Sequence, residues 1–337
     1  MITLLEVILV RVTNKMLSNS FLRDMTANMA NLQTLQQQMT SGKEIRKPSD
    51  DPFKVARAMQ LHTDINTNKQ YNENIKDTIN WLDTTDTALD QAGNVLKRVH
   101  ELLISAGNGG YSDSERQAIK DEINEKVGEF SQILNTNFDG KYIFGGSRGT
   151  TKPLDAIPDG DNVKLVYFKK GGGELNVADP EYNMITQKLN VEISQGVTMK
   201  YNVTASDILE FKDKNGNSKD LRTILKNIVD HLDGNTGPSG SSNPLDDLTG
   251  GDLEDIKSAI NNLLKVRSEV GAKQNRMDSA KEKNEEENFN MTEILSKTED
   301  INITKKTMQY ATMQTVYMAS LQTSARVLQP SLIDYLR

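Results

Sequence analysis

The spacing of apolar residues near both ends of the chain limits the possible folds most strongly. From Leu22 onward, apolar or near-apolar side chains recur at alternating steps of three and four, the pattern of a coiled-coil seam. Similar spacing follows Pro52 and follows Asp252. The first seam is predicted to contain Leu22, Met25, Met29, Leu32, Gln36 and Met39. Long helices from both chain ends are therefore expected.

Local signals bound the first two helices. Gly42 provides a stop for a helix predicted over residues 13–41. Asp51 can cap a second helix over residues 52–106, because its carboxylate accepts an orphan backbone N–H. Pro52 then occupies the first helical position, where a missing N–H costs nothing.

A third helix and a change of period follow. Ser112 and Glu115 have the capping-box spacing, in which each side chain satisfies the other's backbone donor. After Asn137 the apolar residues alternate at period two in several short runs, which predicts strands. Residues 141–233 are therefore expected to be mostly β, with a short helix over 221–232.

The last third of the chain begins with a segment rich in Gly, Ser, Asn and Pro. Residues 234–251 are accordingly predicted to be a flexible connector. Asp252 can cap a helix that continues to about residue 328, since no proline occurs before Pro330. At about 1.5 Å per residue, the first two helices together match this last helix in length.

These elements predict a mainly α fold: an elongated helical rod of long coiled-coil helices from both chain ends, with an inserted, mostly-β module. The predicted parts are residues 1–10 as a start-site extension or disordered tail, 11–48 with 308–337 as a terminal coiled-coil assembly domain, 49–140 with 252–307 as a helical rod domain, 141–233 as an inserted β-rich domain, and 234–251 as a linker.

Composition excludes several classes of function. The net charge of −7 arises from basic and acidic residues mixed along the chain, which argues against nucleic-acid binding and against a membrane surface. Apolar residues make up 36% and aromatic residues 5%, which favours narrow helical seams over a thick core. The absence of cysteine excludes disulfides and thiol catalysis. The apolar start lacks a basic region and a cleavage site, so a cleaved signal peptide is not expected.

Motifs that could carry chemistry have simpler interpretations. Residues 145–149 fit the G-x-S-x-G pattern, but Pro153 follows where a hydrolase needs a helix, which favours a Gly-rich turn. Residues 213–217 have the wrong spacing for a calcium loop and indicate a tight turn. The three histidines are isolated in the sequence, and the polar run 273–287 is interpreted as a solvated helix face. No catalytic residue, metal or cofactor is predicted.

Three segments resemble the bacterial flagellin family. They are TSGKEIRKPSDDP from Thr40, RSEVGAKQNRM from Arg267 and LQTSARVLQPSLIDYL from Leu321. Within the family, the sequence at Pro48–Pro52 and at Tyr142–Gly146 is more similar to proteins of the hook-filament junction than to filament flagellins.

The resemblance implies a structural role outside the cell, at the hook-filament junction of the bacterial flagellum, after export through the flagellar type III apparatus. It implies packing against further copies in a ring and against the other hook-associated protein and flagellin, with an export chaperone before assembly. The residues expected to hold the stacked helices and the neighbouring copies in register are Arg46, Asp50, Asp51, Pro52, Arg267, Asn275, Arg276, Leu22, Met29, Leu32, Leu321 and Leu328. For Asp51 a purely local capping role is about equally probable. A filament flagellin, or a secreted coiled-coil scaffold or translocator without a flagellar role, is the alternative.

Overall fold

The computed structural model describes residues 14–107, 112–234 and 247–327. The predicted start-site extension at residues 1–10 and the candidate residue Leu328 lie outside these ranges. The described chain divides into two compact units, unit 1 with residues 1–66 and 288–337 and unit 2 with residues 67–287. These boundaries differ from the predicted domain ranges, because the helices and the β hairpins of unit 2 share one hydrophobic core.

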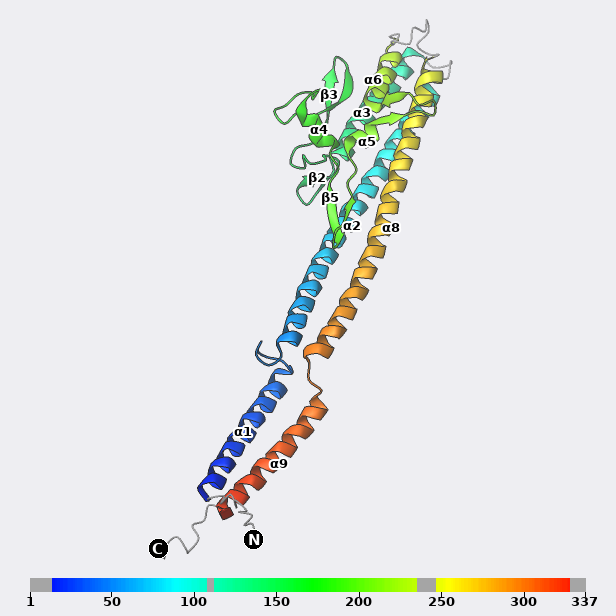
Figure 1. The fold of residues 1–337 in the computed structure, drawn as a ribbon. Coiled ribbons are helices and arrows are strands. Elements are labelled where there is room, and N and C mark those ends of the chain that lie inside the picture. The colour runs from blue at the N-terminus through cyan, green and yellow to red at the C-terminus, as the bar shows by residue number, and fades with distance from the viewer. Residues whose placement is uncertain (1–13, 108–111, 235–246, 328–337) are drawn as a thin grey trace, which may run out of the picture. The chain divides into compact units, whose positions relative to one another are not determined.

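Helices dominate the described chain (Figure 1). The long ones are α1 (Asn14–Ser41), α2 (Pro52–Ala106), α3 (Asp113–Leu134), α8 (Leu253–Glu299) and α9 (Ile303–Val327). The shorter ones are α4 (Pro180–Thr186), α5 (Ala205–Leu209), α6 (Leu221–Leu232) and the π-helical turn η1 (Leu248–Asp252). This confirms the mainly α class with long helices from both ends and a small central β-containing region.

The described strands form two-stranded antiparallel hairpins, and none joins a larger sheet. The pairs are β1 (Asn137–Phe138) with β2 (Lys141–Tyr142), β3 (Leu154–Asp159) with β4 (Asn162–Tyr167), β5 (Asn190–Ser194) with β6 (Val197–Lys200), and β7 (Glu210–Lys212) with β8 (Ser218–Asp220). An isolated hairpin is marginal in water, so these hairpins depend on the helices they pack against. The buried residues of unit 2 accordingly form one cluster that includes residues from helices and hairpins.

The core of unit 2 is built on one face of α2. Ile75, Leu82, Leu89 and Leu96 are fully buried at heptad spacing, as the sequence predicts. Gly93 lies in the same seam, and a Cβ added there would stand 3.3 Å from Leu263 Cδ2 on α8. A larger residue at this position would therefore crowd the contact between α2 and α8.

The predicted capping box is confirmed at the start of α3. Ser112 N donates to Glu115 Oε2 at 2.7 Å, and both reciprocal bonds of the motif are present. Two other predictions are wrong. The last helix is broken between Glu299 and Ile303, and the end of the predicted linker is helical, because Leu248 is fully buried and η1 continues into α8. Asp252 is therefore no cap; its carboxylate lies 2.6 Å from His231 Nδ1.

Candidate assembly surface

The predicted joint between the first two helices is a loop that pairs with the break between α8 and α9. Gly42, at φ +71°, ends α1 in the left-handed conformation, and its N–H donates to Gln38 O at 2.9 Å. Ile301 N then donates to Gly42 O at 3.0 Å, and Glu44 N donates to Glu299 O at 2.6 Å. Two chain segments far apart in sequence thus form a short antiparallel pairing within unit 1.

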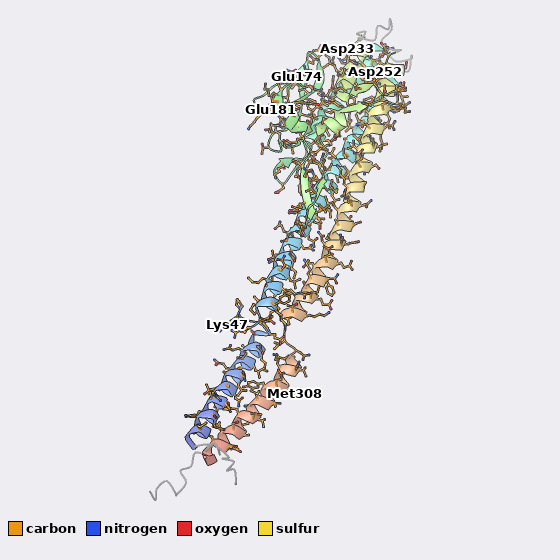
Figure 2. The ribbon with its side chains drawn as sticks, viewed as in Figure 1. Lys47, Glu174, Glu181, Asp233, Asp252 and Met308 are labelled. Atoms are coloured by element: carbon orange, nitrogen blue, oxygen red, sulfur yellow. The ribbon has the colours of Figure 1, made fainter. Side chains whose placement is uncertain are left out.

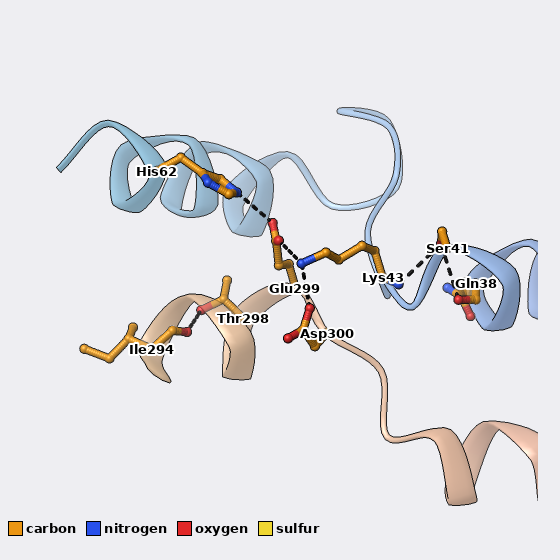
Figure 3. A network of polar contacts seen from close by, with 8 residues as sticks. All are labelled: Gln38, Ser41, Lys43, His62, Ile294, Thr298, Glu299 and Asp300. Carbon is orange, nitrogen blue, oxygen red and sulfur yellow. Dashed lines mark hydrogen bonds and ion pairs between the residues drawn. The ribbon is translucent and has the colours of Figure 1, made fainter. Parts of the chain in front are cut away.

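Lys43 is the polar centre of this joint (Figure 3). Its ammonium contacts the Glu299 carboxylate and lies 2.7 Å from Asp300 Oδ1. His62 Nε2 of α2 lies 3.3 Å from the other oxygen of Glu299. Hydrogen bonds to the two carboxylates raise the pKa of Lys43, and the bond from Lys43 lowers the pKa of Asp300. Sequence reasoning missed this network, because no local motif connects Lys43 with residues more than 250 positions away.

Asp50 and Asp51 each shape the loop locally. Asp50 Oδ2 accepts from the backbone N–H of Arg46 and of Lys47, both at 3.0 Å, and these bonds lower the pKa of Asp50. Asp51 Oδ1 accepts from Lys54 N at 3.0 Å, the geometry of an N-cap ahead of Pro52. Asp51 therefore caps α2, as its local role predicts.

Arg46 contacts α1 within the same unit. Its Nη1 donates to Gln37 Oε1 at 2.6 Å, and the side chain carries no ion pair to the described residues. Lys306 of α9 donates to Gln38 Oε1 at 3.0 Å. Helix α9 therefore contacts the last turns of α1, directly before the loop.

Helices α1 and α9 lie side by side and antiparallel, as Figure 1 shows. The α1 residues that turn toward α9 are Phe21, Met25, Asn28, Leu32, Leu35 and Met39, and the least exposed positions of α9 are Lys306, Tyr310, Met313, Tyr317, Ser320 and Ser324. Both sets repeat at alternating steps of four and three. Leu32 and Met25 are in the seam as predicted.

The predicted register of the α1 seam is wrong at alternate positions. Leu22 and Met29 are 49% and 55% exposed, and Gln36 is exposed, whereas Phe21, Asn28 and Leu35 take the inner places. A step of four from Phe21 and a step of three from Leu22 both reach Met25, so the apolar pattern alone fits either register. The choice depends on the partner helix.

Unit 1 carries many apolar side chains that lie outside the seam between α1 and α9 and are exposed. Most exposed large apolar residues of the described chain belong to this unit, namely Met16, Leu22, Met29, Phe53, Met59, Phe289, Ile294, Ile303, Met308, Val316, Met318 and Leu321. Met308, labelled in Figure 2, also borders a groove of about 540 Å³ between α1 and α9 together with Leu35 and Met313. A concentration of exposed large apolar side chains on one unit favours a surface that another protein covers.

The candidate residues of the RSEVGAKQNRM stretch have different surroundings in unit 2. Arg267 of α8 forks onto α2, with its Nε 2.8 Å from Asp86 Oδ1 and its Nη1 in contact with Asp90. These two carboxylates raise the pKa of Arg267. Asn275 and Arg276 are exposed, and neither side chain has a hydrogen bond or ion pair with the described residues. Arg267 therefore joins two helices of its own chain, while the other two face outward.

The candidate hydrolase turn is a packed structural feature. Gly146 has φ +61°, and a Cβ there would lie 2.3 Å from Ile185 O. Arg148 is buried, with Nη1 2.8 Å from Glu181 Oε1 and Nη2 2.7 Å from Phe168 O. Ser147 Oγ donates to Met184 O at 3.1 Å and has no histidine partner. The turn interpretation agrees with this geometry.

The candidate calcium loop is a hairpin turn between β7 and β8. Asp213 Oδ1 accepts from Asn215 N at 2.7 Å and from Asn217 N at 2.9 Å. Across the described ranges, no three His, Cys, Asp or Glu side chains are placed to hold a metal ion. Nor does any helix in those ranges have the length and apolar content to cross a membrane.

Comparisons with known proteins match the helical regions at both ends of the chain. The family model of the bacterial flagellin N-terminal helical region matches residues 12–148, and that of the C-terminal helical region matches residues 253–336. A flagellin of Bacillus subtilis is 25% identical over 92% of this chain and 93% of the relative. The flagellar hook-associated protein 3 of Escherichia coli is 24% identical over 92% of this chain and 94% of the relative.

Solved structures give the same fold. The flagellar hook-associated protein of Vibrio parahaemolyticus matches with a TM-score of 0.58 and 20% identity, over 74% of this chain and 100% of that chain. The hook-associated protein 3 of Legionella pneumophila matches with a TM-score of 0.56 and 15% identity, over 71% of this chain and 98% of that chain.

Proposed function

We propose that this chain, which belongs to the bacterial flagellin family, is the structural subunit that joins the flagellar hook to the filament. Family membership argues against the alternative of a coiled-coil scaffold unrelated to flagella. The role is one of assembly, and no catalytic step is part of it.

The observation that carries the proposal is the exposed apolar set on unit 1. Leu22 and Met29 stand on α1 outside its seam with α9, and Met308 and Leu321 are exposed on α9. Burying such side chains against another chain stabilises an assembly by about 25 cal/mol for each Å² removed from water. A monomer gains none of this, so the surface favours a subunit whose working state is an assembly.

Two specific features favour the junction over the filament body. Hook-associated protein 3 of two enteric bacteria matches over 77% and 92% of this chain, and hook-associated proteins of Vibrio parahaemolyticus and Legionella pneumophila match in fold with TM-scores of 0.58 and 0.56. The Pro48–Pro52 and Tyr142–Gly146 stretches resemble the junction proteins as well. A filament flagellin is the second candidate, favoured by the Bacillus subtilis relative.

The proposed partners are further copies of this chain in a ring, the other hook-associated protein, flagellin, and an export chaperone before assembly. The location is the extracellular flagellum, reached without a cleaved signal peptide. The absence of cysteine suits a chain exported unfolded, since no disulfide has to form afterwards.

Electron microscopy of a deletion strain tests the proposal. Without the junction subunit, hooks assemble but carry no filament, and flagellin accumulates in the medium. If the chain is instead the filament flagellin, filaments are also absent, but no flagellin appears in the medium. Normal filaments on the deleted cells would contradict both roles.

A further inference from the structure

A cavity of about 660 Å³ in unit 2 is lined by five lysines. It lies between β7, the turn after it and one face of α8. The lysines are Lys188, Lys212, Lys214, Lys265 and Lys273. A cavity of this volume is large enough to hold a few side chains of another protein. What such a cavity accepts depends on how many of its charges are already neutralised.

Two of its carboxylates are fully engaged by their own surroundings. Asp207 contacts Lys188 and accepts from Thr204 N at 2.8 Å. Glu210 accepts the hydroxyl of Tyr167 at 3.0 Å and also that of Tyr182. Both keep their negative charge, but the contact between Asp207 and Lys188 is the one ion pair that they form with a lining lysine among the described residues.

The other two carboxylates, Asp213 and Glu269, also keep their charge, but neither forms an ion pair with a lining lysine among the described residues. Asp213 is taken up by the backbone of its own hairpin turn. Glu269 is exposed on α8 and is within ion-pair distance of none of the lining lysines. Lys188 is therefore the one lining lysine with an ion pair among the described residues.

The positive charge of Lys273 is partly withdrawn from water. Its side chain is partly buried, and its one polar contact is a long bond of 3.4 Å to Asn202 O. Burial and the neighbouring Lys188 lower the pKa of Lys273. Asp207 and Glu269 act on it in the opposite sense, but neither forms an ion pair with it. A cation partly withdrawn from water without a carboxylate at ion-pair distance is destabilised, so an anion placed here would be favourable.

A face of α8 outside the cavity carries an excess of negative charge. Glu282, Glu285 and Glu286 are spaced three and four residues apart, which puts them on one side of the helix. All three are exposed, and none has a cation within ion-pair distance in the described ranges. Like charges at this spacing repel one another. We call these three residues the acidic face.

The acidic face cannot reach the cavity of its own chain. Both are on the same continuous helix, where Glu285 lies twelve positions after Lys273, or about 18 Å along the axis at 1.5 Å per residue. A carboxylate of another copy, displaced along the helix, has no such restriction.

We infer that the lysine-lined cavity binds the acidic face of a second copy of this chain. The unpaired Lys212, Lys265 and Lys273 on one copy meet Glu282, Glu285 and Glu286 on the next. The contact is directional, since each copy offers its cavity to one neighbour and its acidic face to another, which produces a ring or a helix. The inference rests on the proposed function, because it describes how subunits meet in the junction.

Charge reversal in swimming cells tests the contact. One variant carries K265E and K273E, a second carries E282K and E286K, and a third combines all four changes. We expect each reversal alone to leave most hooks without filaments, because like charges then face one another. The combined variant restores attached filaments, because the complementary charges are exchanged.

A matched control reverses exposed charges that belong to neither surface, with K97E and K141E in one variant and E73K and E125K in another. These are expected to keep filaments. Filaments unaffected by either single reversal would overturn the inference. A combined variant that is present in isolated flagella or secreted in folded form, yet fails to restore filaments, would also overturn it.

Crosslinking separates this inference from the proposed function. The chain has no cysteine, so a K265C/E286C variant carries the only two thiols. In isolated flagella, a short bismaleimide is expected to link copies into dimers and higher multimers, and a K141C/E125C control is expected to remain monomeric. A K265C/E286C protein that is present in flagella but remains monomeric contradicts the contact alone. Absence of the unmodified protein from isolated flagella would contradict the proposed function.

Discussion

The ammonium of Lys43 lies 2.7 Å from Asp300 Oδ1 and contacts Glu299 as well, across the joint where α1 ends and α8 gives way to α9. The side chain of Lys43 is 42% exposed, so solvent weakens the pair, and the pair is expected to contribute up to about 1 kcal/mol. K43M should therefore speed hydrogen exchange of the Glu44 and Ile301 amides by up to about fivefold.

The same pair gives a pH dependence with a definite sign. The pKa of Asp300 is lowered from 3.8, so its contribution is present above that pH and is lost as pH falls through the folded-state pKa. The pKa of Lys43 is raised from 10.5, so its contribution is lost only as pH rises through its folded-state value. The difference between wild type and K43M should be constant at neutral pH and shrink in acid. A difference that grows in acid would contradict the pairing.

Asn302 starts α9, because its Oδ1 accepts from Lys305 N at 3.0 Å and its carbonyl accepts from Lys306 N. N302A should cost about 0.5 to 2 kcal/mol of helix stability. Hydrogen exchange measures the effect, and the amides of Lys305 and Lys306 should exchange faster in N302A. N290A, at an exposed position inside α8, should leave these amides unchanged.

Arg267 and Arg276 are a matched pair nine positions apart on α8. R267Q removes a fork onto Asp86 and Asp90 and leaves those like charges one turn apart on α2, so it should lower stability by about 1 to 2 kcal/mol. R276Q changes an exposed side chain without a described partner and should change stability by less than about 0.5 kcal/mol. Urea unfolding measures both, and equal losses would contradict the assigned roles.

The sequence predicts the long elements well because their signals are local. Heptad spacing places α2, Asp51 and Pro52 set its start, and Ser112 with Glu115 sets the start of α3. Each of these depends on residues within one or two turns of one another. The RSEVGAKQNRM and TSGKEIRKPSDDP stretches likewise identify the family without any knowledge of packing.

Features that depend on distant residues are the ones that sequence reasoning missed. The break after Glu299 needs Gly42 and Lys43 as partners, and the inner register of α1 needs α9 to choose between Phe21 and Leu22. The sequence marks Arg267 as a residue that holds helices and neighbours in register, but it does not reveal the partners Asp86 and Asp90, which lie 181 and 177 positions away. The Asn302 cap was readable in the sequence, as an Asn three residues before Lys305, but no proline or glycine accompanied it.

Unit 1 should be looser than unit 2 in the free monomer. Among described residues of α1 and α9, only Ser324 is buried, whereas α2 holds fully buried Ile75 and Leu89. Short helices gain most of their stability from packing, so α1 to about Gln38 and α9 from Met308 onward should exchange amide hydrogens quickly. Protection of α9 equal to that of residues 75–103 would contradict this and would mean that unit 1 needs no neighbour.

The most direct test of the account is electron microscopy of cells whose only copy of the chain carries L22S and M29S. Both side chains are exposed outside the seam between α1 and α9, so the monomer should keep its stability while the assembly loses apolar contact. The account predicts bare hooks and flagellin in the medium, and it predicts normal filaments for the control M184S/V197S, whose changed residues are exposed in unit 2. Normal filaments on the L22S/M29S cells would contradict it.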